Sequence, residues 1–74
     1  MQQHTTNNLF MRTGTVKFYN IKNKFGFIRE DETNGEYYVE LRDILTPPLM
    51  QGDRVTFDLR DAKRGPKCVE VKKI

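Results

Sequence analysis

The sequence contains no tryptophan and only one cysteine among its 74 residues. A lone cysteine, Cys68, excludes a disulfide within the chain and fits a reducing compartment. No apolar run approaches the roughly 18 residues that a membrane-spanning helix needs. The first ten residues lack the basic start and apolar stretch of a secretory signal. These absences favour a soluble cytoplasmic protein without a membrane role.

The residue patterns of enzymes and metal sites are also missing. His4 is the one histidine, and no nucleophile lies near it in the sequence. Cys68 is expected to be a packing residue, because a cysteine behaves as a small apolar side chain. The chain has no His/Cys spacing typical of a metal site and no glycine-rich phosphate loop. We therefore expect no catalytic residue, no metal and no cofactor.

The length of the chain allows one domain, because 74 residues are too few for a second core. Residues 1–11 are polar and rich in amides, and they show no usable period. We predict that 1–11 form a flexible N-terminal extension and that 12–74 form the folded domain.

Charge is unevenly distributed along the folded part. Residues 12–28 carry four cations and no acid, 29–61 carry nine acids against four arginines, and 62–74 carry five cations against one acid. Two basic ends that meet in space would form a face that attracts polyanions. The alternative is a solvated surface with ordinary charge scatter.

From residue 13 the chain shows short runs of β-branched and aromatic residues separated by turn signals, which is typical of strands. The pair Asn34-Gly35 favours a two-residue hairpin turn, since both positions tolerate positive φ. Such a pattern predicts an all-β barrel or sandwich. The predicted strands are 13–20, 24–29, 36–41, 54–60 and 68–72, with a helical turn over 42–45.

Alternation in the second and third strands places the side chains on two faces. With a two-residue loop, Phe25, Phe27, Tyr38 and Glu40 share one face, and Ile28, Tyr37 and Val39 share the other. The β-branched face suits the core. The aromatic face then lies outward, where rings beside lysines would stack bases and neutralise phosphates. The alternative, that these aromatics are simply core, remains open at this point.

Several segments resemble the cold-shock domain family. GTVKFYNIKNKFGFI (14–28) is similar to the family's opening GTVKWFNxxKGFGFI, and EYYVE (36–40) stands where the family commonly has DVFVH. GDRVTFDLRDAKRGPKCVEVKKI (52–74) is similar to its closing pattern. These motifs occur in the family's order at compatible spacings over 13–74.

The resemblance implies a five-stranded antiparallel OB-fold barrel that binds single-stranded RNA or DNA, as an RNA chaperone or a regulator of transcription or translation. Phe18 can join the binding face only if a bulge or strand end breaks the alternation near it. The implied contact residues are Lys17, Phe18, Tyr19, Asn20, Lys24, Phe25, Phe27, Tyr38, Glu40 and Arg64.

Five departures from the family pattern predict weaker or narrower binding. Phe18 replaces the usual tryptophan, Asn23-Lys24 replaces a Lys-Gly pair, and Glu40 replaces a histidine. Leu41 replaces the aromatic that follows, and the connection 44–52 is short, with two prolines and no aromatic. The competing hypothesis is a barrel reused for protein interaction or for self-association by domain swapping. We expect a monomer that binds a single strand.

Overall fold

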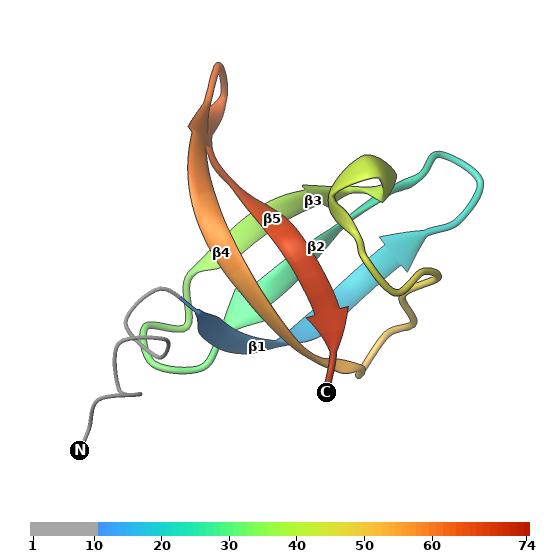
Figure 1. Ribbon diagram of the computed structural model, residues 1–74, viewed down its shortest axis with the longest axis horizontal. Helices are drawn as coiled ribbons and strands as arrows, with labels where there is room; N and C mark the ends of the chain where they lie inside the picture. The colour runs from blue at the N-terminus through green and yellow to red at the C-terminus, as the bar shows by residue number, and fades with distance from the viewer. Residues whose placement is uncertain (1–10) are drawn as a thin grey trace.

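The computed structural model describes residues 11–74, so residues 1–10 of the predicted extension lie outside the described residues. Five strands and one short 3-10 helix follow one another along the chain (Figure 1). They are β1 (Arg12–Asn20), β2 (Phe25–Glu30), β3 (Glu36–Glu40), η1 (Leu41–Asp43), β4 (Arg54–Ala62) and β5 (Gly65–Lys73).

The strands close into a barrel in the order β1-β2-β3-β5-β4, with β4 pairing back to β1. The predicted all-β barrel is therefore confirmed. One pairing is not antiparallel: β3 and β5 run parallel and meet at Tyr38 and Lys67. A closed ring of five strands cannot alternate direction throughout, so one neighbouring pair must be parallel.

The β4–β5 hairpin is longer than the sequence pattern predicts. Gly65 and Pro66 lie between the predicted strands 54–60 and 68–72, but they pair with Ala62 and Asp61 in the ladder. β5 therefore starts three residues before the expected strand. In Figure 1 this hairpin stands away from the barrel at the top of the view.

The core contains the β-branched face of β2 and β3, as predicted. Ile28 and Val39 are fully buried, and Tyr37 packs against them. The alternative that the aromatics Phe25, Phe27 and Tyr38 form the core is wrong, since none belongs to it. Cys68 is fully buried and fills a core position. The core cluster consists of Val16, Ile28, Val39, Ile44, Leu49, Val55, Phe57, Cys68 and Val71.

Alternation in β5 is broken by an irregularity that the sequence did not reveal. Strict alternation would put Val69 and Val71 on one face, but Cys68 and Val71 join the core cluster, and Val69, although buried, does not. Glu70 has a positive φ of 51°, and the β4–β5 register shifts between Thr56 and Asp58. The extra residue moves the following side chain to the opposite face.

The β2–β3 connection spans the five residues 31–35, instead of the predicted two-residue turn. The Glu30 N–H donates to the Gly35 carbonyl (2.8 Å), and Asn34 at the loop end has a φ of 60°. The register is shifted by four residues from the expected one. Because four is even, every side chain keeps its predicted face.

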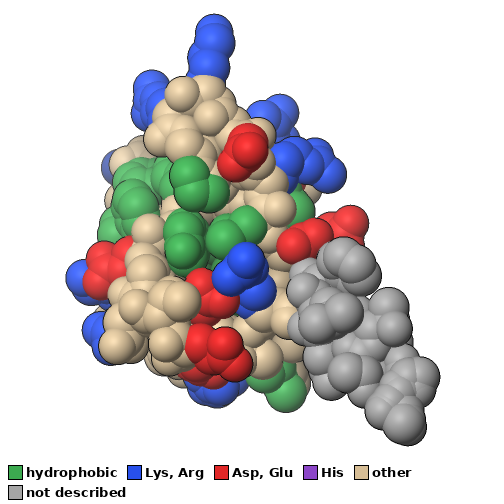
Figure 2. Space-filling model, turned by 90° about the vertical axis from the view of Figure 1, so that its left-hand side faces the viewer, with side chains coloured by type: hydrophobic (Ala, Val, Ile, Leu, Met, Phe, Trp, Pro, Cys, Tyr) green, Lys and Arg blue, Asp and Glu red, His purple; other side chains and the backbone are tan. Residues whose placement is uncertain are grey.

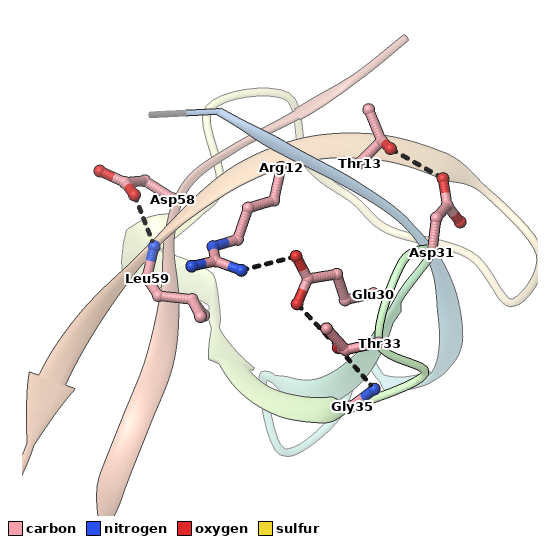
Figure 3. Close-up of polar contacts among 8 residues, drawn as sticks. All are labelled: Arg12, Thr13, Glu30, Asp31, Thr33, Gly35, Asp58 and Leu59. Carbon is pink, nitrogen blue, oxygen red and sulfur yellow. Dashed lines mark hydrogen bonds and ion pairs between the residues drawn. The ribbon is translucent and has the colours of Figure 1, made fainter. Parts of the chain in front are cut away.

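This loop is held by a polar clasp that consists of Arg12, Thr13, Glu30, Asp31, Thr33 and Arg54. In Figure 3 the Arg12 guanidinium points at the buried Glu30, to which it donates at 2.6 Å, and the Thr33 hydroxyl donates to the other Glu30 oxygen at 3.1 Å. Arg54 binds both oxygens of Asp31, at 2.8 and 2.7 Å. These bonds join β1, β4 and the β2–β3 loop at one end of the barrel.

Candidate nucleic-acid interface

Four aromatic side chains form a cluster on the outer face of β1, β2 and β3. We call Phe18, Phe25, Phe27 and Tyr38 the aromatic platform. Phe25 and Tyr38 are stacked with centroids 5.9 Å apart, and Phe18 lies 5.7 Å from Phe27. All four rings are partly or largely exposed, Phe18 most plainly at 39%. The rings support one another and still present apolar surface to solvent.

A β-bulge places Phe18 on this platform. Val16 pairs with Ile28, but Phe18 pairs with Phe27, so Lys17 is the extra residue. Strict alternation would have directed Phe18 toward the side of Val16, which is buried in the core. The irregularity that the family resemblance required near Phe18 is therefore present.

Gly26 allows β1 and β2 to come together beneath the platform. It lies between the two platform phenylalanines of β2 and pairs with Tyr19. A Cβ at Gly26 would collide with the Phe18 carbonyl oxygen and with the backbone and ring of Tyr19. A side chain here would push β1 away and displace Phe18.

A groove of about 670 Å³ separates the platform from the β4–β5 hairpin. Phe25, Phe27 and Tyr38 line one wall, and residues 62–67 of the hairpin line the other. Figure 2 shows hydrophobic side chains gathered beneath the hairpin and Lys and Arg side chains at its tip. The cations that line the groove are Arg42, Lys63, Arg64 and Lys67.

Glu40 is the one carboxylate lining this groove within residues 11–74. Its Oε2 accepts from Lys67 Nζ at 3.1 Å and from Arg42 Nη2 at 3.4 Å. Lys67 also lies 3.0 Å from Asp43, and hydrogen bonds to Asp43 and then Glu40 raise the pKa of Lys67. The acid that departs from the family pattern is therefore paired with two neighbouring cations, one of which it shares with Asp43.

The other predicted contacts on β1 are Lys17, Tyr19 and Asn20, and each interacts with a different part of the protein. Lys17 is exposed and pairs with Glu36 at 2.8 Å, which lowers the pKa of Glu36. Tyr19 packs against the core instead of the platform, and burial raises the pKa of its hydroxyl. The Asn20 side chain accepts from the Asn23 N–H at 2.9 Å and so holds the turn that follows β1.

Lys24 and Arg64 both lie in connections between strands, Lys24 between β1 and β2 and Arg64 between β4 and β5. Lys24 directly precedes β2 with an exposed side chain and a φ of 64°. The backbone thus keeps the left-handed conformation that suits the family's glycine, at a cost of about 1–2 kcal/mol for a residue with a Cβ. Arg64 lies at the hairpin tip and lines the groove.

Sequence reasoning missed four cations near the platform. Arg42, Lys63 and Lys67 line the groove. Arg29 pairs with Glu36 and, by alternation, shares the outer face with Phe27. Alternation could have found Arg29. Lys67 could not be found from sequence, since the parallel β3–β5 contact brings it to Tyr38.

Two further structural findings concern the described residues. No helix between residues 11 and 74 is long and apolar enough to cross a membrane. The same stretch holds no group of three or more His, Cys, Asp or Glu side chains arranged to bind a metal ion.

Comparison with known proteins gives three kinds of match. Residues 12–74 match the family described as 'Cold-shock' DNA-binding domain. Cold shock-like protein CspA of Vibrio cholerae is 34% identical over 62 residues, covering 80% of this chain and 89% of that protein. A cold shock protein of Arthrobacter globiformis is 34% identical over 64 residues, covering 82% and 96%.

A solved structure shares the fold. Drosophila Unr CSD456 superposes with a TM-score of 0.74 at 17% identity, over 99% of this chain. This chain spans 31% of that longer one.

Proposed function

Because this chain belongs to the cold-shock DNA-binding domain family, we propose that it binds single-stranded RNA or DNA by stacking bases on the aromatic platform. The family binds nucleic acid. The observation that carries the assignment to this surface is the outward position of four clustered rings beside a core that is complete without them. Exposed clustered aromatics usually mark a binding surface.

The groove suits a single strand more than a duplex. Bases must be unpaired before their faces can lie on aromatic rings, and each stacked base contributes roughly 1–3 kcal/mol. Arg42, Lys63 and Arg64 line the groove and can neutralise phosphates along the same strand. Lys17, Lys24, Asn20 and Tyr19 are proposed as peripheral contacts. A protein that binds only unpaired strands also shifts RNA away from base-paired structure by mass action, which supports a chaperone role.

The proposal is tested by titrating a labelled pyrimidine-rich single strand and its duplex at low and moderate salt. We expect micromolar or tighter binding of the single strand at low salt, weaker binding as salt rises, and much weaker binding of the duplex. Phe27→Ala removes one ring and should weaken binding by about 1–3 kcal/mol. Lys17→Ala should weaken it less and reduce the salt dependence.

Met50→Ala is the matched control, because Met50 is 55% exposed and does not line the groove. Its affinity should equal that of the unmodified protein. Absence of single-strand binding at low salt would contradict the proposal and favour the protein-interaction hypothesis.

The structure also supports proposals for the oligomeric state, the location and the absence of catalysis. Closure of the barrel between β1 and β4 of one chain supports a monomer, which sedimentation equilibrium would test. The unpaired, buried Cys68 fits a cytoplasmic location. We propose binding without catalysis as the whole activity of residues 12–74.

A further inference from the structure

Glu40 lies where a stacked base would present its edge. It pairs with Phe25 across the β2–β3 ladder and follows Tyr38 by two residues on the same face. It lines the groove together with both of these rings, and its side chain is 30% exposed. A base that lies on Phe25 or Tyr38 is therefore within the reach of a carboxylate.

The Glu40 carboxylate is held by one of its two oxygens. Oε2 accepts from both Lys67 and Arg42, and Lys67 is itself held by Asp43 (3.0 Å) with only 13% of its side chain exposed. Within residues 11–74, no donor bonds to Oε1. The anchored carboxylate thus offers one oxygen, and this oxygen can only accept a hydrogen bond.

Glu40 Oε1 interacts differently with the phosphate and with the base of a nucleotide. A phosphate is repelled by it, whereas a base with N–H groups on its edge can donate to it. Cytosine, adenine and guanine each project an exocyclic amino group, and pairing of a glutamate with the cytosine N4 amino group is a standard contact. Uracil and thymine instead have a carbonyl on either side of their one ring N–H, and these carbonyls oppose a carboxylate oxygen.

We propose that Glu40 makes this groove selective for a base with an exocyclic amino group, over uracil and thymine. The inference rests on the proposed function, since it requires a strand on the aromatic platform. It also gives a function to Glu40, which replaces the histidine of the family pattern. The acid narrows the choice of base, while Lys67 and Arg42 limit the loss of affinity that an isolated carboxylate would cause.

The test compares labelled seven-nucleotide strands of deoxycytidine and deoxyuridine at pH 7.5 by fluorescence anisotropy. The two bases are alike in size, and they differ in the group at C4 and in the proton at N3. We expect the cytosine strand to bind about tenfold more tightly, as one hydrogen bond to a charged group contributes on this scale.

Glu40→Gln should bring the two affinities within about twofold, because an amide can accept from an amino group and also donate to a carbonyl. Arg42→Ala keeps the carboxylate and should weaken both strands while preserving the preference for cytosine. Glu32→Gln makes the same chemical change in the β2–β3 loop, outside the groove, and should leave the ratio unchanged. Circular dichroism would verify that each variant is folded.

The outcomes separate the two proposals. If both strands bind, Phe27→Ala weakens both, and the unmodified protein shows no preference for cytosine, the selectivity of Glu40 is wrong and the proposed function stands. A preference that survives in Glu40→Gln also overturns the inference. If neither strand binds at low salt, the proposed function and the inference fail together.

Discussion

At the scale of single residues, Phe18 limits the area on which a base can stack. It is the most exposed of the four platform rings, and it stands where the family has tryptophan. Stacking strength grows with the area of the two overlapping ring systems. The affinity of the platform is therefore adjustable at this one position.

We predict that Phe18→Trp tightens single-strand binding a few-fold. The larger ring covers more of a base, and Phe18 has exposed space around it. Because the chain has no other tryptophan, the new indole reports on its own site. Its fluorescence should be quenched when a strand is added, and the titration gives the affinity directly. Unchanged fluorescence at saturation would mean that bases do not reach position 18.

Cys68 behaves as part of the core. Burial raises the pKa of its thiol to about 12, so almost no thiolate exists at neutral pH. We predict that Cys68 resists an aromatic disulfide reagent at pH 8 in the folded protein and reacts at once in guanidinium. Fast reaction without denaturant would show that β5 opens locally on the timescale of the assay.

At the scale of elements, the platform depends on how β1 lies on β2. The bulge at Lys17 turns Phe18 outward, and the bare backbone at Gly26 lets the two strands approach. Both determine where the rings lie.

Gly26→Ala should lower the free energy of unfolding by about 1–3 kcal/mol, the usual cost of inserting a methyl group into a filled space. The added Cβ meets backbone atoms of β1, which cannot rotate away as a side chain can. Urea denaturation measures this loss, and strand titration should show weaker binding as Phe18 moves. Ile21→Ala, in the exposed turn between the strands, serves as the control. Full stability of Gly26→Ala would mean that β1 shifts at little cost.

The elements also show how far the sequence predicts the structure. The faces of Phe25, Phe27 and Tyr38 follow from alternation, and they hold although the β2–β3 register differs by four residues from that of a tight Asn34-Gly35 turn. The loop length could not be read locally, because Asp31 is bound by Arg54 from β4. The bulge in β5 could not be predicted either, since no residue type marks the positive φ of Glu70.

At the scale of the whole molecule, the polar clasp ties together segments that are distant in sequence. Arg54 reaches both Asp31 and Thr15, and Thr13 donates to Asp31 at 2.7 Å. Hydrogen bonds from Arg54 and then Thr13 lower the pKa of Asp31 from 3.8 to about 2. A carboxyl whose pKa is depressed by folding stabilises the fold only while it is ionised.

The contribution of Asp31 is therefore present above pH 4 and is lost as the pH falls from about 4 to about 2. We predict that Asp31→Asn lowers the urea midpoint at pH 7 and reduces its fall over this acid range. Glu32→Gln removes an exposed carboxylate from the same loop and should leave the acid dependence of the midpoint nearly unchanged. Identical profiles for Asp31→Asn and the unmodified protein would show that the clasp does not stabilise the fold.

The tip of the β4–β5 hairpin can change in length or charge without a change in the core of the barrel. The groove has one wall on the closed barrel and the other on residues 62–67, which lie next to the hairpin tip and outside the core cluster. Lengthening this tip or exchanging its cations alters the groove without disturbing a core side chain. Ligand preference can therefore change at the hairpin tip while the core cluster of the barrel is retained.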